Sequence, residues 1–230
     1  MNLKFHFLSL IAIGFSIAVF SGCNSFTTGK ISEGTIEYAV TYPPGQKNDF
    51  MTSLMPGAIK YNFKNNEASV DLEISMGIVS TSLISNLNKK EVIQTLKIMG
   101  KKYAVVMDTV GVQQMIDKEP KSKITFIDGT KMIAGYNCKH AKVTYESDTI
   151  APFDVYYTED INIENPNWSS PFRDIKGVLM EFHIKKYGLE MILTAKSVSK
   201  KNIEDRVFEL SPDYKVISME EMDKMFSDLN

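Results

Sequence analysis

Apolar and polar residues alternate with a period of two over many short segments of this chain. The segments Ile36–Tyr42, Ile59–Phe63 and Ala68–Ile74 show the alternation most clearly. Successive side chains of a strand point to opposite faces, so this period predicts β-strands with one face buried. Turn residues separate the segments at Asn65-Asn66, and no repeated strand–helix alternation of a parallel sheet is present.

Further turn signals follow the same pattern and predict antiparallel hairpins. Gly100 separates two β-like segments, and Asp128-Gly129 and Tyr187-Gly188 do the same further along the chain. Asn and Gly tolerate the left-handed backbone angles that two-residue hairpin turns require. The expected fold class is therefore mainly β (α+β), with an antiparallel sheet as its main element.

Few segments have the spacing of a helix. Asn48–Met55 and Thr109–Asp117 predict short helices that could cover the sheet. Ser218 and Glu221 have the spacing of a capping box, and the apolar residues that follow predict a C-terminal amphipathic helix. The irregular stretch from Glu159 to Phe172 is the longest predicted loop, and loops of this length are often functional or disordered.

The N-terminus has the layout of a secretory signal. Lys4 precedes an uncharged apolar segment from Phe7 to Phe20, which is shorter than the ~20 residues of a membrane-spanning helix. The segment ends in Phe20, Ser21, Gly22 and Cys23, which resembles the lipobox of bacterial lipoproteins. The resemblance implies cleavage before Cys23 and attachment of lipid to its sulfur. An ordinary signal peptide with an incidental cysteine is the alternative.

This N-terminal pattern divides the chain into three parts. Residues 1–22 are predicted to be a lipoprotein signal peptide, residues 23–33 the lipidated Cys23 and a flexible tether, and residues 34–230 a single β-rich domain. The tether is short enough to keep the domain close to the membrane. It lacks an acidic cluster after Cys23, which favours a protein facing the periplasm.

Composition and motifs indicate a protein that is not an enzyme. The formal net charge of −2 provides no basic footprint for nucleic acid. No nucleophile elbow or phosphate-binding glycine loop occurs, so no catalytic residue and no cofactor is proposed. His140 and His183 lack ligand spacing for a metal and are expected to face solvent from strands. Cys138, the cysteine that remains after lipidation, is expected to be a buried structural residue.

Methionine is unusually frequent, with 13 residues in the chain. Three interpretations are open, namely ordinary core packing, an adaptable apolar binding surface, and capture of Cu(I) by thioethers. Core packing is the interpretation that the scattered spacing favours, because closely spaced Met motifs with His are absent.

Several stretches together resemble an uncharacterised family of Gram-negative envelope lipoproteins, a domain of unknown function. They are Ile59–Asn65, Ile133–Ala141, Val155–Asp160, Ile175–Phe182, Leu193–Val198 and Phe208–Glu221. The strand order and length of that family are similar to the lipoprotein carriers LolA and LolB. The resemblance implies a single strongly curved antiparallel sheet, or half-open β-barrel, whose apolar face is covered by a few short helices and shelters acyl chains.

Two functions follow as hypotheses. The first is a membrane-anchored, non-enzymatic binding protein or carrier for a hydrophobic ligand, an acyl chain or lipid. The second is a structural or accessory lipoprotein that binds an envelope protein partner and has a fully packed sheet interior. Both are expected in the outer membrane, facing the periplasm. The apolar ligand face of the carrier hypothesis is formed by Phe50, Leu54, Met180, Phe182, Met191 and Leu193.

The lipid anchor is directly testable. Replacing Cys23→Ser should leave an unprocessed precursor that takes up no radiolabelled palmitate, because the acceptor sulfur is gone. The variant Cys138→Ala, which removes the other thiol, should incorporate palmitate normally. Labelling of the Cys23→Ser chain would contradict the lipoprotein assignment.

Overall fold

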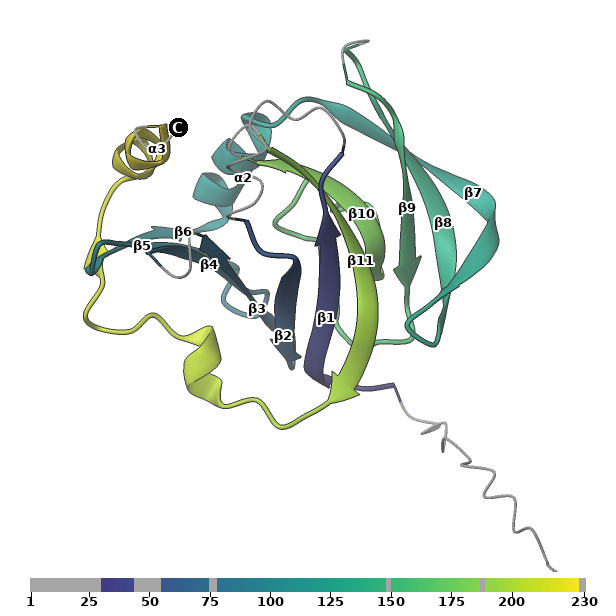
Figure 1. Cartoon of the computed structure of the whole chain (residues 1–230), viewed down its shortest axis with the longest axis horizontal. Helices are drawn as coiled ribbons and strands as arrows, with labels where there is room; N and C mark the ends of the chain where they lie inside the picture. The colour runs from purple at the N-terminus through teal and green to yellow at the C-terminus, as the bar shows by residue number, and fades with distance from the viewer. Residues whose placement is uncertain (1–29, 44–54, 75–77, 148–149, 187–188, 228–230) are drawn as a thin grey trace, which may run out of the picture.

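The chain folds into one open, mainly β structure in the computed structural model (Figure 1), which describes residues 30–43, 55–74, 78–147, 150–186 and 189–227. Twelve strands form a single sheet in the order β12-β6-β5-β4-β3-β2-β1-β11-β10-β9-β8-β7. The strands are β1 (Glu33–Thr41), β2 (Ala58–Lys64), β3 (Glu67–Ile74), β4 (Val79–Asn86), β5 (Glu91–Ile98), β6 (Lys101–Met107), β7 (Ser122–Ile133), β8 (Tyr136–Tyr145), β9 (Phe153–Thr158), β10 (Val178–Lys186), β11 (Leu189–Lys200) and β12 (Lys215–Val216).

The sheet is mixed, which corrects the expectation of a wholly antiparallel one. Strands β1 to β11 pair antiparallel with their neighbours, whereas the two-residue strand β12 lies parallel to β6. β12 reaches β6 through the long connection after β11, so its direction is not set by a hairpin. Figure 1 shows the sheet bending strongly along its strand order, with β2–β6 and β7–β9 on opposite sides of β1 and β11.

Apolar clusters cover both faces of the β4–β6 part of the sheet. Val92 and Leu96 pack against α2 (Thr109–Asp117) and α3 (Met219–Ser227) on one face. On the other face, Ile84 and Ile93 pack against the connection that contains the 3₁₀ helix η2 (Asp205–Phe208). Strands buried on both faces lose the strict alternation of apolar and polar residues.

Hairpin turns are present at two of the predicted places, and their residues have the left-handed backbone angles that were expected. Asn65 and Asn66 have φ of 47° and 71° between β2 and β3, and Met99-Gly100 has 47° and 81° between β5 and β6. Positive φ at both central residues matches the twist of the paired strands. Tyr187-Gly188 lies outside the described residues, but the flanking pair Lys186↔Leu189 has the expected register.

The predicted hairpin at Asp128-Gly129 is wrong. β7 runs through these residues, and the register against β8 shifts between Ile127 and Thr130. Gly129, with φ of 117°, therefore belongs to a bulge. The turn lies at Ala134-Gly135, with φ of 48° and 84°, where Ala at the first position gave no turn signal.

The helices have identifiable caps. α2 spans the predicted residues, and the Asp108 carboxylate accepts hydrogen bonds from the amides of Val110 and Gly111 at 3.0 and 2.9 Å. At α3, the predicted capping box is formed by Ser218 and Glu221, which exchange two hydrogen bonds. Of the expected helix Asn48–Met55, all residues except Met55 lie outside the described residues.

β1 joins the two halves of the sheet. It pairs with β2 on one side and with β11 on the other. At Gly34 the backbones of β1 and β11 approach closely, because a Cβ added there would be 2.3 Å from the carbonyl oxygen of Ser199. No side chain fits at that position without moving the β1–β11 pair.

Replacing Gly34→Ala should therefore lower the free energy of unfolding by about 3 kcal/mol, since backbone must shift to relieve the contact. Gly57→Ala is the matched control, because a Cβ there meets nothing within 4 Å. That change should alter stability by less than about 1 kcal/mol. Urea denaturation followed by circular dichroism measures both, and equal stabilities of the two variants would contradict the predicted role of Gly34.

Candidate functional site

Four of the six residues predicted to form an apolar ligand face lie on β10 and β11, namely Met180, Phe182, Met191 and Leu193. Phe182 pairs with Leu193 and Ile184 with Met191, which brings these side chains to one face. The register shift between Leu179 and Glu181 lies in β10, against β9. Sequence alternation therefore predicted correctly that these side chains share a face, apart from the irregularity near Met180.

Protein atoms cover this face. Met180, Met191 and Leu193 are 0%, 2% and 4% exposed and belong to one core cluster with residues of β1 and β2. Phe182 is partly buried and contacts Tyr38 and Phe172 edge to face, with ring centroids 5.8 and 6.1 Å apart. Phe50 and Leu54, the other two predicted face residues, lie outside the described residues.

A buried hydrogen bond holds the same region together. The Tyr38 hydroxyl donates to the carbonyl oxygen of Leu179 at 2.6 Å, across the strand β11 that separates β1 from β10. Burial raises the pKa of Tyr38 well above its usual value, because the phenolate would be desolvated. The interaction fixes the inner side of β1 against β10 and leaves Tyr38 protonated at neutral pH.

The connection from Glu159 to Gly177, which we name the strap, packs across the sheet. The Asn167 side-chain amide donates to the carbonyl oxygens of Ile175 and Gly177 at 2.7 and 2.9 Å. The indole of Trp168 donates to Ser85 of β4 at 2.9 Å, and Phe172 lies in the core. The long loop of the sequence is therefore an ordered element that links β4 to β9 and β10.

Two pockets stand out in the described part of the chain, and neither is lined by the predicted face residues. One, of about 510 Å³, lies beside β6 and the start of α3. The other, of about 260 Å³, lies on the strap beside Trp168 and Arg173. Sequence reasoning missed both, because each combines residues that are far apart in the sequence.

Cys138 is buried, as predicted, with no exposed surface. Its thiol lies 3.5 Å from the carbonyl oxygen of Tyr136. Burial raises its pKa from 9.0 to about 11, so the nucleophilic thiolate is disfavoured near neutral pH. These properties are those of a structural cysteine.

The two histidines are partly buried, which corrects the expectation that they face solvent. The His140 ring stacks on Tyr156 at 4.8 Å and lies 2.8 Å from the Asp154 carboxylate. The His183 ring stacks on Phe153 at 4.6 Å and lies 3.2 Å from Glu190. Each imidazole has its own carboxylate partner, and among the described residues no three His, Cys, Asp or Glu side chains gather as a metal site.

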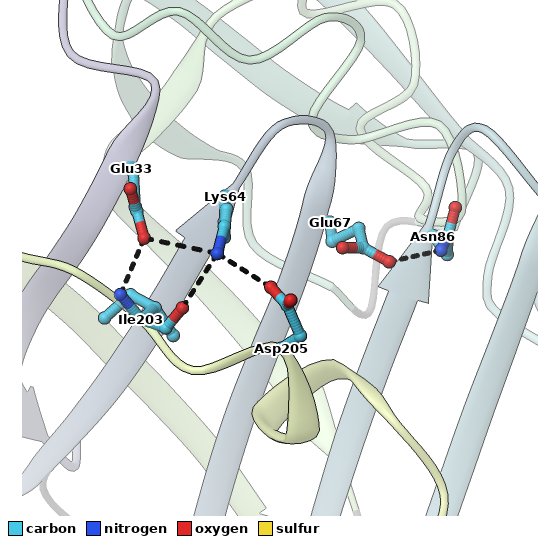
Figure 2. A network of polar contacts seen from close by, with 6 residues as sticks. All are labelled: Glu33, Lys64, Glu67, Asn86, Ile203 and Asp205. Atoms are coloured by element: carbon cyan, nitrogen blue, oxygen red, sulfur yellow. Dashed lines mark hydrogen bonds and ion pairs between the residues drawn. The ribbon is translucent and has the colours of Figure 1, made fainter.

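Polar contacts fix the beginning of β1 against the segment after β11 (Figure 2). The Lys64 ammonium contacts Asp205 at 2.7 Å and the carbonyl oxygen of Ile203 at 3.1 Å, and Glu33 accepts from the Ile203 amide at 2.7 Å. The hydrogen bond from Lys64 to Asp205 raises the pKa of Lys64. This network holds the first residue of β1 and the last residue of β2 against the connection that follows β11.

Residues before β1 also contact the domain. Ile31 forms a parallel bridge with Ile161 of the strap, and the Asn162 amide donates to the Ile31 carbonyl oxygen at 2.8 Å. The fold thus includes residues that the sequence assigned to the tether. The lipobox residues Phe20, Ser21, Gly22 and Cys23 precede the described residues, within which no helix is long and apolar enough to cross a membrane.

Comparisons with known proteins give limited matches. A family model described as "N-glycanase peptide, N-terminal domain" matches residues 65–171, which is less than half of the chain. A beta-barrel-like protein of domain of unknown function DUF1849 from Brucella abortus is similar in structure, with a TM-score of 0.30 and 8% identity. The match covers 76% of this chain and 100% of that one. No curated protein matches.

The raised pKa of Cys138 predicts a pH dependence. The unfolded thiol loses its proton near pH 9 and the folded thiol near pH 11, so the Cys138 contribution to stability is complete below pH 9 and declines between those values. Urea denaturation of the protein and of Cys138→Ala, in reducing buffer, should give a stability difference of about 1–2 kcal/mol at pH 7 that shrinks above pH 9. The buried tyrosines are common to both chains, so their own titrations cancel except for the interaction between Tyr38 and Cys138, which raises the pKa of Tyr38 and counts as part of the Cys138 contribution. A difference that stays constant to pH 11, or rapid labelling of the folded thiol, would contradict this assignment.

Proposed function

We propose that this protein is a lipid-anchored accessory lipoprotein of the Gram-negative envelope that binds a protein partner and carries out no catalysis. The lipobox pattern ending at Cys23 supports the anchor, and the absence of a nucleic-acid footprint or catalytic motif in the sequence supports a binding role. The proposed location is the outer membrane, with the domain facing the periplasm.

The observation that carries this proposal is the burial of the predicted ligand face. Met180, Met191 and Leu193 are covered by neighbouring protein side chains. Binding sites for small molecules are usually largely preformed cavities of roughly 300–1,000 Å³. The carrier hypothesis needs such a space next to Met180 and Met191, and both pockets described above lie elsewhere.

The anchor would hold the domain near the membrane surface. Ile31 already contacts the strap, so only a few residues separate Cys23 from the folded domain. Even a fully extended chain of that length spans at most about 25–30 Å. A domain held at that distance is restricted to partners at the membrane surface, which suits an accessory protein better than a carrier that must leave the membrane.

Uptake of a fluorescent fatty acid distinguishes the two functions. The mature chain can be prepared without lipid as Cys23→Ala behind an ordinary secretory signal. We expect no saturable uptake of the probe at micromolar concentrations, because the face is filled. Met191→Gln should destabilise this chain by about 2 kcal/mol, since a buried amide would lack partners, without changing its behaviour toward the probe.

The opposite result identifies the carrier function. The accessory proposal would be overturned if the unmodified domain takes up the probe saturably and Met191→Gln weakens this uptake more than it lowers stability. Thr194→Gln is the matched control, because Thr194 belongs to the same strand and is offset by one residue from the apolar face. It should leave both stability and probe behaviour nearly unchanged.

A further inference from the structure

Core packing explains only some of the many methionines in the sequence. Four of them are at most 3% exposed and lie in the core clusters, namely Met107, Met180, Met191 and Met222. Three others are partly buried against the cluster that contains α2 and α3, namely Met115, Met219 and Met225. Met99 and Met132 differ from both groups. They are 84% and 64% exposed and belong to none of the apolar clusters of the described residues.

Met99 occupies a turn position that its side chain does not favour. It is the first central residue of the turn between β5 and β6, and its φ is 47°. Asn and Gly tolerate this left-handed conformation better than a long apolar residue does. The Met99 amide donates to the carbonyl oxygen of Ile78 at 3.4 Å, but the exposed side chain gains little from the hydrophobic effect. Neither packing nor turn preference therefore explains Met99.

Met132 lies on β7, at the outer edge of the sheet. In the described part of the chain β7 pairs with β8 alone, where Met132 is opposite Asn137. Edge strands are usually protected by charged or polar side chains at exposed positions. Met132 instead places a thioether in water, directly before the buried Ile133.

A thioether in water is open to oxidation by a small peroxide. The methionine sulfur attacks one oxygen of hydrogen peroxide, the sulfur–oxygen bond forms and the oxygen–oxygen bond breaks. The hydroxide that leaves takes the proton of the transferred oxygen and becomes water. The thioether thus loses two electrons to the peroxide and becomes a sulfoxide, which methionine sulfoxide reductases convert back to the thioether.

Burial decides whether the fold tolerates the product. The sulfoxide of Met180 or Met191 would be a buried polar group among apolar side chains, which is costly without a hydrogen-bond partner. At Met99 and Met132 water can hydrogen-bond to the sulfoxide oxygen, because most of each side chain is exposed. Oxidation at these two positions should therefore leave the fold intact.

We propose that Met99 and Met132 are reversible oxidation sites, at which a small peroxide converts the thioether to a sulfoxide that the fold tolerates. Each site needs one thioether and access from water, so the two methionines need not approach each other. The periplasm, which is the proposed location, is an oxidising compartment. The inference does not depend on the lipid anchor or on the partner-binding function.

Peptide mapping by mass spectrometry tests the two sites on the mature chain as it is purified from cells. The folded protein is treated with hydrogen peroxide, and the sulfoxide at each methionine is followed over time. We expect Met99 and Met132 to be oxidised at least about tenfold faster than Met180 and Met191, because a peroxide reaches a buried sulfur only when the structure opens. In the urea-unfolded protein all four should react at similar rates, which makes this sample the control for intrinsic reactivity.

Variants and reductases test the tolerance and the reversal. Replacing Met99→Leu together with Met132→Leu should remove the fast oxidation and leave the urea midpoint unchanged. Met191→Leu, a volume-conserving core change, is the matched control and should retain the fast oxidation at both sites. Protein oxidised at Met99 and Met132 should keep the circular dichroism spectrum and the urea midpoint of the untreated protein. The two methionine sulfoxide reductases, one for each sulfoxide epimer, should then restore both thioethers in the folded protein.

Three results would overturn the inference. The first is oxidation of Met99 and Met132 in the folded protein that is no faster than that of Met180 and Met191. The second is unfolding of the protein when these two sites are oxidised, and the third is failure of the reductases to restore them. Fatty-acid uptake is measured independently of methionine oxidation, so a failure here leaves the proposed function as it stands.

Discussion

The antiparallel pairing of β1 with β11 is the contact on which the rest of the fold depends. β2 to β6 follow one another as neighbours in the sheet, and so do β7 to β11. β1 connects these two series, because it pairs with β2 and with β11 at opposite edges. The pair brings together residues far apart in sequence, so its formation must overcome the chain entropy of closing a long loop. Gly34 provides the close backbone approach, and the contacts around Lys64 fix the same end.

The strap adds further contacts between parts of the sheet that the β1–β11 pair brings together. It extends from β9 to β10 and contacts β4 through Trp168 and the N-terminal segment through Ile31. Phe172 and Ile175 bury apolar surface against the inner part of β8 to β10. An open, curved sheet would otherwise expose a large apolar face to water, which is unfavourable in proportion to its area. Here side chains of the protein itself cover the described part of that face.

The two described histidines and Cys138 are held by contacts within the protein. His140 and His183 each stack on an aromatic ring and pair with a carboxylate, and Cys138 is kept as a thiol by burial. Groups of this kind often indicate chemistry when they converge in a cleft. In the described part of this chain they are distributed over separate positions of the sheet.

The sequence alone determined the features that depend on neighbouring residues. Alternation predicted the strands, the residues 109–117 predicted α2, and the turns at Asn65-Asn66 and Gly100 were correct because their backbone angles follow from local steric preferences. The face shared by Phe182 and Leu193 followed from the same alternation. Asp128-Gly129 was misassigned because a bulge and a hairpin use the same residue types, and only the pairing of β7 with β8 decided between them. Likewise, a pattern of apolar residues indicates that a face avoids water but not whether a ligand or the protein covers it. The burial of Met180 and Met191 and the parallel placement of β12 were decided by contacts between distant segments, which local residue preferences do not encode.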